Sequence, residues 1–276
     1  MFDERRHDID ALRSIALFLL IFYHLAVSFT SVAKWILFVP NNKPIDNIWS
    51  LLSIFNIWRI PLLFIIAGIA LRFSYQNRGA GKLFKERFKR LGIPYLFGVV
   101  TFVPLYIIIS AQFIYGDMSL DDNIGVLITS IFTGGHLWFL INILIYCLLL
   151  IPIIGFISNK KRGYKFVDSI LKIRGGVLLF SIPIILEGYL LDLTAYKEDI
   201  AYGNSYSEYY GTDHGLLLGF IWFLIGIVLT SQGDTFWEYN IKNINTHALI
   251  GVPLLINRFV NCLLYTSDAA DDLYRV

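Results

Sequence analysis

The sequence predicts an all-α, polytopic integral membrane bundle whose N-terminus lies in the cytoplasm. Hydrophobic residues make up 56% of the 276 residues and charged residues only 16%, and the mean hydropathy is +0.62. The apolar residues come in blocks of about 20, the length at which a helix crosses a bilayer. Basic residues gather in alternate connections between these blocks. A soluble domain of this length needs far more charge on its surface.

Seven hydrophobic segments are the predicted spanning helices, with ends uncertain by several residues. A shorter apolar stretch at 124–132 is too short to span, so we expect it at the interface or in a re-entrant hairpin. The seven segments are 11–39, 49–71, 91–115, 136–157, 175–191, 215–230 and 248–264.

The distribution of Lys and Arg predicts the orientation, because cytoplasmic loops of membrane proteins are enriched in these residues. With the N-terminus inside, 17 of the 23 basic residues fall in cytoplasmic stretches and only Lys43 and Lys197 in outer loops. The net charge of +2 gives no global field that would favour nucleic acid.

The first segment carries the clearest candidate site. His24 lies near the predicted midplane, and Arg13 lies eleven residues earlier, on the same helix face within about 20°. Asp10 lies three residues before Arg13. An imidazole at this depth suits general-base chemistry on a hydroxyl. The alternative is a structural His24 that hydrogen-bonds across helices.

Two further ionisable residues fall inside predicted spans, where charge is costly and tends to be functional. Arg59 precedes Pro61 in the second segment and is predicted to face a cavity or an anion, or else to extend its head outward to the interface. Glu187 in the fifth segment is predicted to pair with a buried partner such as Arg59 or His24, or to lie at the outer interface.

The stretch 72–90 is the strongest charge feature, with seven basic residues against Glu86. One interpretation is topological: such a loop stays inside and contacts anionic lipid. The other is an anion site at the cytoplasmic mouth, in which Arg72, Arg87 and Arg90 hold phosphate groups.

His136 begins the fourth segment in the string GGHLWFL. His136 and Trp138 are candidates to line an outer acceptor site, because an indole ring stacks well on the face of a sugar. The alternative is an interfacial aromatic belt. The histidines are scattered and the two cysteines form no CxxC pair, so no metal is expected.

One membrane domain is expected over 1–264. The last dozen residues, YTSDAADDLYRV, lose the apolar character abruptly and resemble translated sequencing-adaptor read-through. We therefore expect 265–276 to be a foreign tail on a domain that is truncated at its C-terminus.

At these residues the sequence resembles the membrane acyltransferase-3 family, and within it the glucan biosynthesis protein C group, which is linked to succinylation of periplasmic glucans. The strongest match is RRHDIDALRSIALFLLIFYH at 5–24. Supporting matches are RIPLLFIIAGIALRF at 59–73, LFKERFKRLGIPYLFGVVTFVP at 83–104, HLWFL at 136–140 and, more weakly, the stretch 216–242.

The resemblance implies a bacterial inner-membrane O-acyltransferase of about ten helices. It implies that an acyl group, acetyl or succinyl, passes from a cytoplasmic acyl-CoA to a hydroxyl of an extracytoplasmic carbohydrate. His24 matches the essential histidine of the family, and Arg87 and Arg90 match its basic motif. Ala67 stands where the family often has Ser, so no nucleophile is expected there.

From these residues we predict that His24 takes the acceptor proton, directly or through a relay, and that Asp10 positions Arg13. Arg13, Arg72, Arg87 and Arg90 are predicted to hold the phosphates of coenzyme A. Two other classes remain open: a transporter with a His, Arg and Glu relay, and a non-catalytic sensor or scaffold. The candidate substrate-binding residues are Arg59, His136, Trp138 and Glu187.

Overall fold

The computed structural model describes residues 7–30, 33–34, 38–45, 48–116, 119–133, 135–157, 163–193, 213–231 and 233–273. Within these ranges every regular element is helical, as predicted. In the first half they are α1 (His7–Val27), α2 (Ile48–Arg78), α3 (Ala80–Arg87), the π-helical turn η2 (Phe88–Gly92), α4 (Ile93–Val100), α5 (Phe102–Tyr115) and α6 (Leu120–Thr133). In the second half they are the 3₁₀ turn η3 (Gly135–Leu137), α7 (Trp138–Leu150), α8 (Ile154–Ile157), α9 (Gly163–Lys172), the 3₁₀ turn η4 (Gly176–Ser181), α10 (Ile182–Leu193), α12 (Asp213–Thr230), α13 (Asp234–Lys242) and α14 (Ile244–Leu273).

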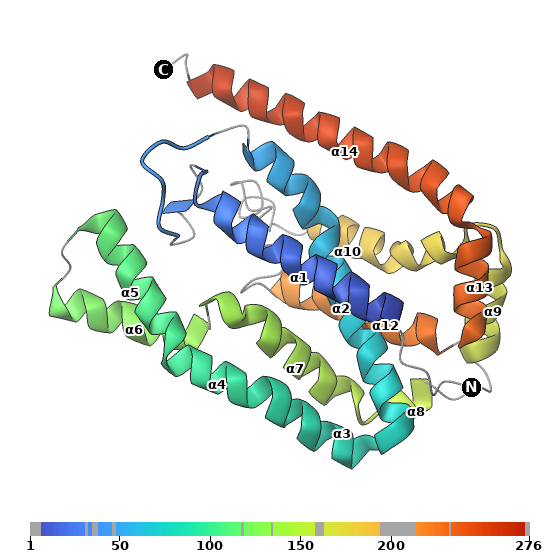
Figure 1. The fold of residues 1–276 in the computed structure, drawn as a ribbon. Coiled ribbons are helices and arrows are strands. Elements are labelled where there is room, and N and C mark those ends of the chain that lie inside the picture. Colours follow the sequence, from blue (N-terminus) through green and yellow to red (C-terminus); the bar gives the residue numbers. More distant parts are fainter. Residues whose placement is uncertain are drawn as a thin grey trace.

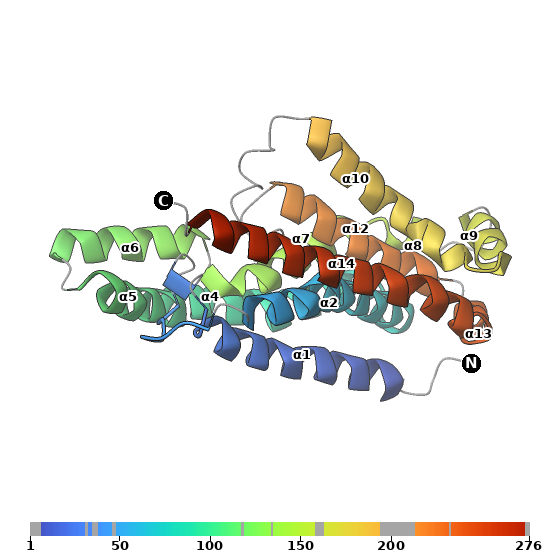
Figure 2. The same ribbon diagram turned by 90° about the horizontal axis from the view of Figure 1, so that it is seen from above.

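Helix α2 is the centre of the bundle. It packs against α1 on one side and against α12 on the other, and α12 in turn packs against α10 (Figure 2). The largest core cluster joins α2, α7 and α12 through side chains such as Phe64, Tyr146 and Phe223. This cluster is therefore the main packed core of the described part of the chain.

Glycines let α2 and α12 approach each other closely. A Cβ atom at Gly68 would lie 2.1 Å from the backbone oxygen of Phe223, and one at Gly226 would lie 2.3 Å from that of Ile65. Since lipid solvates apolar side chains as well as protein does, membrane helices associate through this kind of close backbone packing. The conformation of the central pair therefore depends on having no side chain at these two positions.

Among the described residues, three helices are long and apolar enough to cross a membrane, and the bent pair of α12 and α13 makes a fourth if the pair is a single span. Three shorter apolar helices begin at Gly135, Gly176 and Ile244. The protein is thus a polytopic α-helical membrane protein, and each predicted segment contains one of these helices. The predicted end of the first segment at residue 39 is wrong, because α1 ends at Val27 and a turn follows.

The basic stretch 72–90 is almost wholly helical, so its description as a loop is wrong. Helix α2 continues to Arg78, Gly79 turns the chain with φ of 70°, and α3 begins at Ala80. Figure 1 places α3, α8, α9 and α13 at the end of the bundle that holds the start of α1, with α5 and α6 extending from the opposite end. The basic segments of the described chain therefore gather at one end, as the topology prediction requires.

The short stretch predicted at the interface forms α6. It packs against α5, and the two helices make the hairpin seen in Figure 1. Its predicted place at the interface or in a re-entrant hairpin stays a prediction.

Candidate functional site

His24 lies one turn before the end of α1, and its ring is held by the helix itself. Nδ1 lies 2.7 Å from the backbone oxygen of Leu20. A carbonyl oxygen only accepts, so Nδ1 carries the proton and donates it in this hydrogen bond. In the neutral imidazole the other nitrogen, Nε2, then carries the lone pair. The hydrogen bond to Leu20 thus makes Nε2 the basic nitrogen of the His24 ring.

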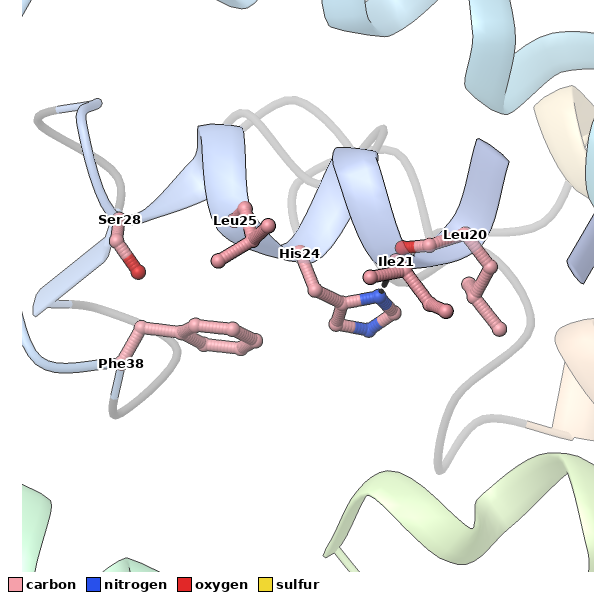
Figure 3. Close-up of a pocket in the computed structure, with 6 residues that line it drawn as sticks. All are labelled: Leu20, Ile21, His24, Leu25, Ser28 and Phe38. Atoms are coloured by element: carbon pink, nitrogen blue, oxygen red, sulfur yellow. Dashed lines mark hydrogen bonds between the residues drawn. The ribbon is translucent and has the colours of Figure 1, made fainter. Parts of the chain in front are cut away.

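An open hollow of about 460 Å³ lies beside this ring (Figure 3). It is lined by Leu20, Ile21, His24, Leu25, Ser28 and Phe38. Ligand pockets are commonly some hundreds of cubic ångströms in volume and mostly apolar, with a few polar groups. The imidazole of His24 and the hydroxyl of Ser28 are the polar groups in this one.

His136 lies next to His24, although 112 residues separate them in the chain. Their ring centroids are 5.8 Å apart with the planes at 64°. The His136 ring stacks on Tyr106 at 4.7 Å, and Phe38 lies 4.8 Å away on its other side. His136 Nε2 is buried and has no hydrogen-bond partner among the described atoms. The sequence predicted both histidines as site residues, and the structure brings them together.

Arg59 is buried next to Tyr23, the residue that precedes His24 on α1. Its side chain is 1% exposed, and its guanidinium carbon lies 4.1 Å from the centre of the Tyr23 ring. The charge of Arg59 is also within electrostatic reach of His24. A cation over an aromatic face is stabilised by the ring quadrupole. Arg59 therefore faces the bundle interior and does not extend to the interface.

The predicted phosphate-binding arginines lie at the end of the bundle where α2 turns into α3. Arg72 is 7% exposed, and its Nε atom is buried without a hydrogen-bond partner, as is that of Arg87. An Nη atom of Arg87 donates to the backbone oxygen of Ala70 at 3.1 Å and to Ser74 Oγ at 2.8 Å. Part of the Arg87 guanidinium therefore holds α3 against α2, and its Nε remains available to an anion.

Glu86 neutralises part of the positive charge at this end of the bundle. It forms an ion pair with Arg78 and another, of 2.9 Å, with Arg90, which is 69% exposed. The hydrogen bond from Arg78 to Glu86 raises the pKa of the Arg78 guanidinium above its ordinary value. Arg90, which is predicted to bind an anion, is therefore also paired with the carboxylate of Glu86.

Arg13 joins this cluster from α1. Its charge is within electrostatic reach of Arg87. Helix α1 is continuous from His7 to Val27, so Arg13 and His24 lie about 16 Å apart along its axis. Arg13 thus lies near α3 and His24 near the start of α7. Asp10 lies one turn before Arg13 on the same helix, and its predicted role in positioning Arg13 stays a prediction.

Two predicted substrate-binding residues have neighbours other than the pair of histidines. The Trp138 ring, half-buried at the start of α7, packs against Phe64 at 6.4 Å and Phe139 at 5.9 Å. Glu187 on α10 forms a buried ion pair with His214 on α12. The suggestion that Glu187 pairs with Arg59 or His24 is therefore wrong, and this pair instead joins α10 to α12.

Sequence reasoning missed four of the side chains around these groups. Phe38, Tyr23 and Tyr106 form the aromatic surround of the two histidines, and His214 is the partner of Glu187. Aromatic residues are abundant in this chain, so no local pattern distinguished these three. His214 follows a polar stretch, and only the packing of α12 against α10 reveals its role.

The comparisons with known proteins give one match. A family model described as an acyltransferase domain matches residues 6–265, which is nearly the whole chain. No curated protein and no solved structure matches it significantly. The matched range contains α1 with His24, the arginine end of α2 and α3, and the turn that carries His136. The chain therefore belongs to the acyltransferase-3 family of membrane acyltransferases.

Proposed function

We propose that the protein transfers an acyl group from acyl-CoA to a hydroxyl of an extracytoplasmic carbohydrate, a glucan or a surface polysaccharide. The observation that carries this proposal is the state of His24. Its Nδ1 proton is committed to Leu20, and its ring borders an open hollow with the second nitrogen available as a base. Family membership supports the reaction class.

The chemistry follows from this geometry. His24 Nε2 accepts the proton of the acceptor hydroxyl while the hydroxyl oxygen attacks the thioester carbonyl carbon. The carbon–sulfur bond then breaks, and the departing thiolate takes the proton back from Nε2. The products are an ester and free thiol, so neither a metal nor a redox partner is needed.

Under this proposal, Arg59 stabilises the negative charge that develops during the reaction. The tetrahedral intermediate carries a negative charge on the former carbonyl oxygen, and a buried cation near it stabilises that charge strongly where water is excluded. Arg59 is buried and within electrostatic reach of His24. We therefore assign Arg59 to stabilisation of this intermediate.

The donor fits the opposite end of α1. Coenzyme A carries its phosphates on the nucleotide and its thiol at the end of a long flexible arm. Arg13, Arg72, Arg87 and Arg90 would hold the phosphates, and the buried Nε atoms of Arg72 and Arg87 fit an anion in particular. The arm would then cover the roughly 16 Å between Arg13 and His24.

The proposal locates the protein in the bacterial cytoplasmic membrane, with the donor end facing the cytoplasm. The acyl group would be acetyl or succinyl, since the resemblance points to glucan modification. Lipid and carbohydrate are the expected partners, and no nucleic acid is expected.

The decisive test replaces the base. We expect His24→Gln to reduce acyl transfer by about 10²–10⁴-fold, the usual contribution of a general base. The measurement is incorporation of labelled acetyl or succinyl groups into glycans by membranes that contain the full chain. His247→Gln is the matched control, because His247 lies on α14 away from this site. Transfer at the wild-type rate in His24→Gln membranes would overturn the proposed mechanism.

A further inference from the structure

We propose that the hollow beside His24 is the acceptor subsite, with the Phe38 ring as the platform on which a sugar ring lies and Ser28 as the hydroxyl that orients it. This inference rests on the proposed function and adds the residues that select the acceptor. Neither Phe38 nor Ser28 was among the site residues predicted from the sequence.

Phe38 is placed directly against the base. Its ring stacks on the His24 ring, with centroids 5.7 Å apart and planes at 24°. Figure 3 shows the two rings side by side along the hollow, with Leu25 above them on α1. A sugar whose apolar face covers the Phe38 ring would therefore bring one of its hydroxyls next to His24.

Contacts with several other side chains hold the Phe38 ring in place. It contacts His136 at 4.8 Å, and His136 stacks on Tyr106 of α5 at 4.7 Å. Phe38 also packs against a buried cluster of Tyr23, Val27 and Leu52. Because aromatic rings have few rotatable bonds, a ring fixed by such contacts loses little entropy when a ligand stacks on it.

Ser28 supplies a polar group on the other side of the hollow. Its backbone is anchored: the amide donates to Leu25 at 3.3 Å, and the carbonyl accepts from the Asn41 amide at 2.8 Å. The Ser28 hydroxyl points toward the space between Leu25 and Phe38 (Figure 3). It is placed to hydrogen-bond a second hydroxyl of the sugar that stacks on Phe38.

The lining favours a sugar over a lipid chain. An alkyl chain would gain from the apolar side chains, yet it would cover the Ser28 hydroxyl and the His24 imidazole without hydrogen-bonding either, which costs free energy. A pyranose has an apolar face and a hydroxyl rim, so it matches both parts. Ile21 and Leu25 are each 60% exposed, so the hollow opens along the flank of α1.

The test measures acceptor and donor kinetics separately. The probes are acetyl-CoA and succinyl-CoA as donors and a linear glucose oligomer as acceptor, with the full chain in nanodiscs. We expect Phe38→Leu to raise the KM for the oligomer about five- to ten-fold, the loss of one aromatic stacking contact, and to leave the KM for the donor unchanged. Phe38→Trp keeps the stack and should stay near the wild type. Phe22→Leu is the matched control, because Phe22 lies on α1 and does not line the hollow.

A change in the KM for the donor in Phe38→Leu, with the KM for the oligomer unchanged, would show that the hollow holds the acyl chain and would overturn the inference. Equal kinetics for Phe38→Leu and wild type would also overturn it. Loss of transfer in His24→Gln with no effect of Phe38→Leu would leave the proposed function intact and remove only the subsite. Unchanged transfer in His24→Gln would instead remove the proposed function.

A second measurement does not depend on turnover. In a Ser28→Cys variant, a small maleimide should label the new thiol, and the glucose oligomer should slow that labelling. Phe22→Cys should be labelled at a rate that the oligomer does not change, and the wild-type chain gives the background from its own cysteines. Equal labelling of Ser28→Cys with and without the oligomer would contradict the subsite.

Discussion

Helices α1 and α2 lie side by side but serve the protein in opposite ways. Helix α2 is the packed centre: 56% of its spanning window is buried, and it contacts α1, α7, α12 and α14. Helix α1 is peripheral, with only 11% of its window buried, yet it carries both Arg13 and His24. The proposed base therefore lies on a peripheral helix, where substrates can reach it. The packed helix α2 carries Arg59, one of the side chains near it.

Substitution of one phenylalanine in each helix should separate the two roles most strongly. Phe64 on α2 is 0% exposed and packs against Phe139 and Tyr146, whereas Phe22 on α1 is 54% exposed. We expect Phe64→Ala to lower the free energy of unfolding by about 3 kcal/mol through lost packing. Phe22→Ala should leave it within about 0.5 kcal/mol. Thermal stability of the detergent-solubilised protein, followed by size-exclusion chromatography, is the measurement. Equal losses in the two variants would show that α1 is packed as tightly as α2.

Addition of one methyl group at the α2–α12 contact should have the next largest effect. A Cβ at Gly68 meets the backbone of Phe223, which cannot move as a side chain does, so Gly68→Ala should cost about 1–3 kcal/mol. Gly188 on α10 has open space around it, and Gly188→Ala should be neutral or slightly stabilising. The same thermal assay compares them. A stable Gly68→Ala variant would mean that the two central helices are further apart than the structure shows.

A pair of serines gives the smallest expected difference. Ser74 on α2 donates to the backbone of Ala70 and also accepts from Arg87, whereas Ser14 on α1 donates to the backbone of Asp10 and, among the described residues, has no such arginine partner. We expect Ser74→Ala to cost about 1 kcal/mol by removing the Arg87 contact and to raise the KM for acyl-CoA. Ser14→Ala should change neither quantity. If both variants bind acyl-CoA like the wild type, Arg87 does not depend on α2 for its position.

Much of the fold could be predicted from the sequence because hydropathy along the chain is a local property. The seven apolar segments coincide with helices, and the basic stretches lie together at one end. Helix ends were harder, because an end depends on what the helix packs against. Val27 ends α1 well before the apolar run stops. Arg72 and its neighbours stay helical because α3 folds back and Arg87 holds the two helices together.

The candidate site was predictable in part. His24 and Arg13 could be placed on one helix from spacing alone, and His136 was recognised as a polar residue at the start of a span. Trp138 was a candidate because an indole stacks well on a sugar, and Glu187 because an ionisable group inside a span tends to be functional. Pattern alone cannot tell which side of a helix faces the site when every side is apolar, and the structure turns both residues to other neighbours.

Three properties could be read from the amino-acid sequence: the protein is a helical membrane protein, an imidazole and a guanidinium occupy one helix, and cations gather in alternate connections. These properties follow from composition and spacing within single segments. Other properties depend on the tertiary structure. They are the ring contacts of His24 with His136 and Phe38, the pairing of Glu187 with His214, and the need for glycine at position 68. Such contacts join residues far apart in the chain, and only the packing of one helix against another fixes them.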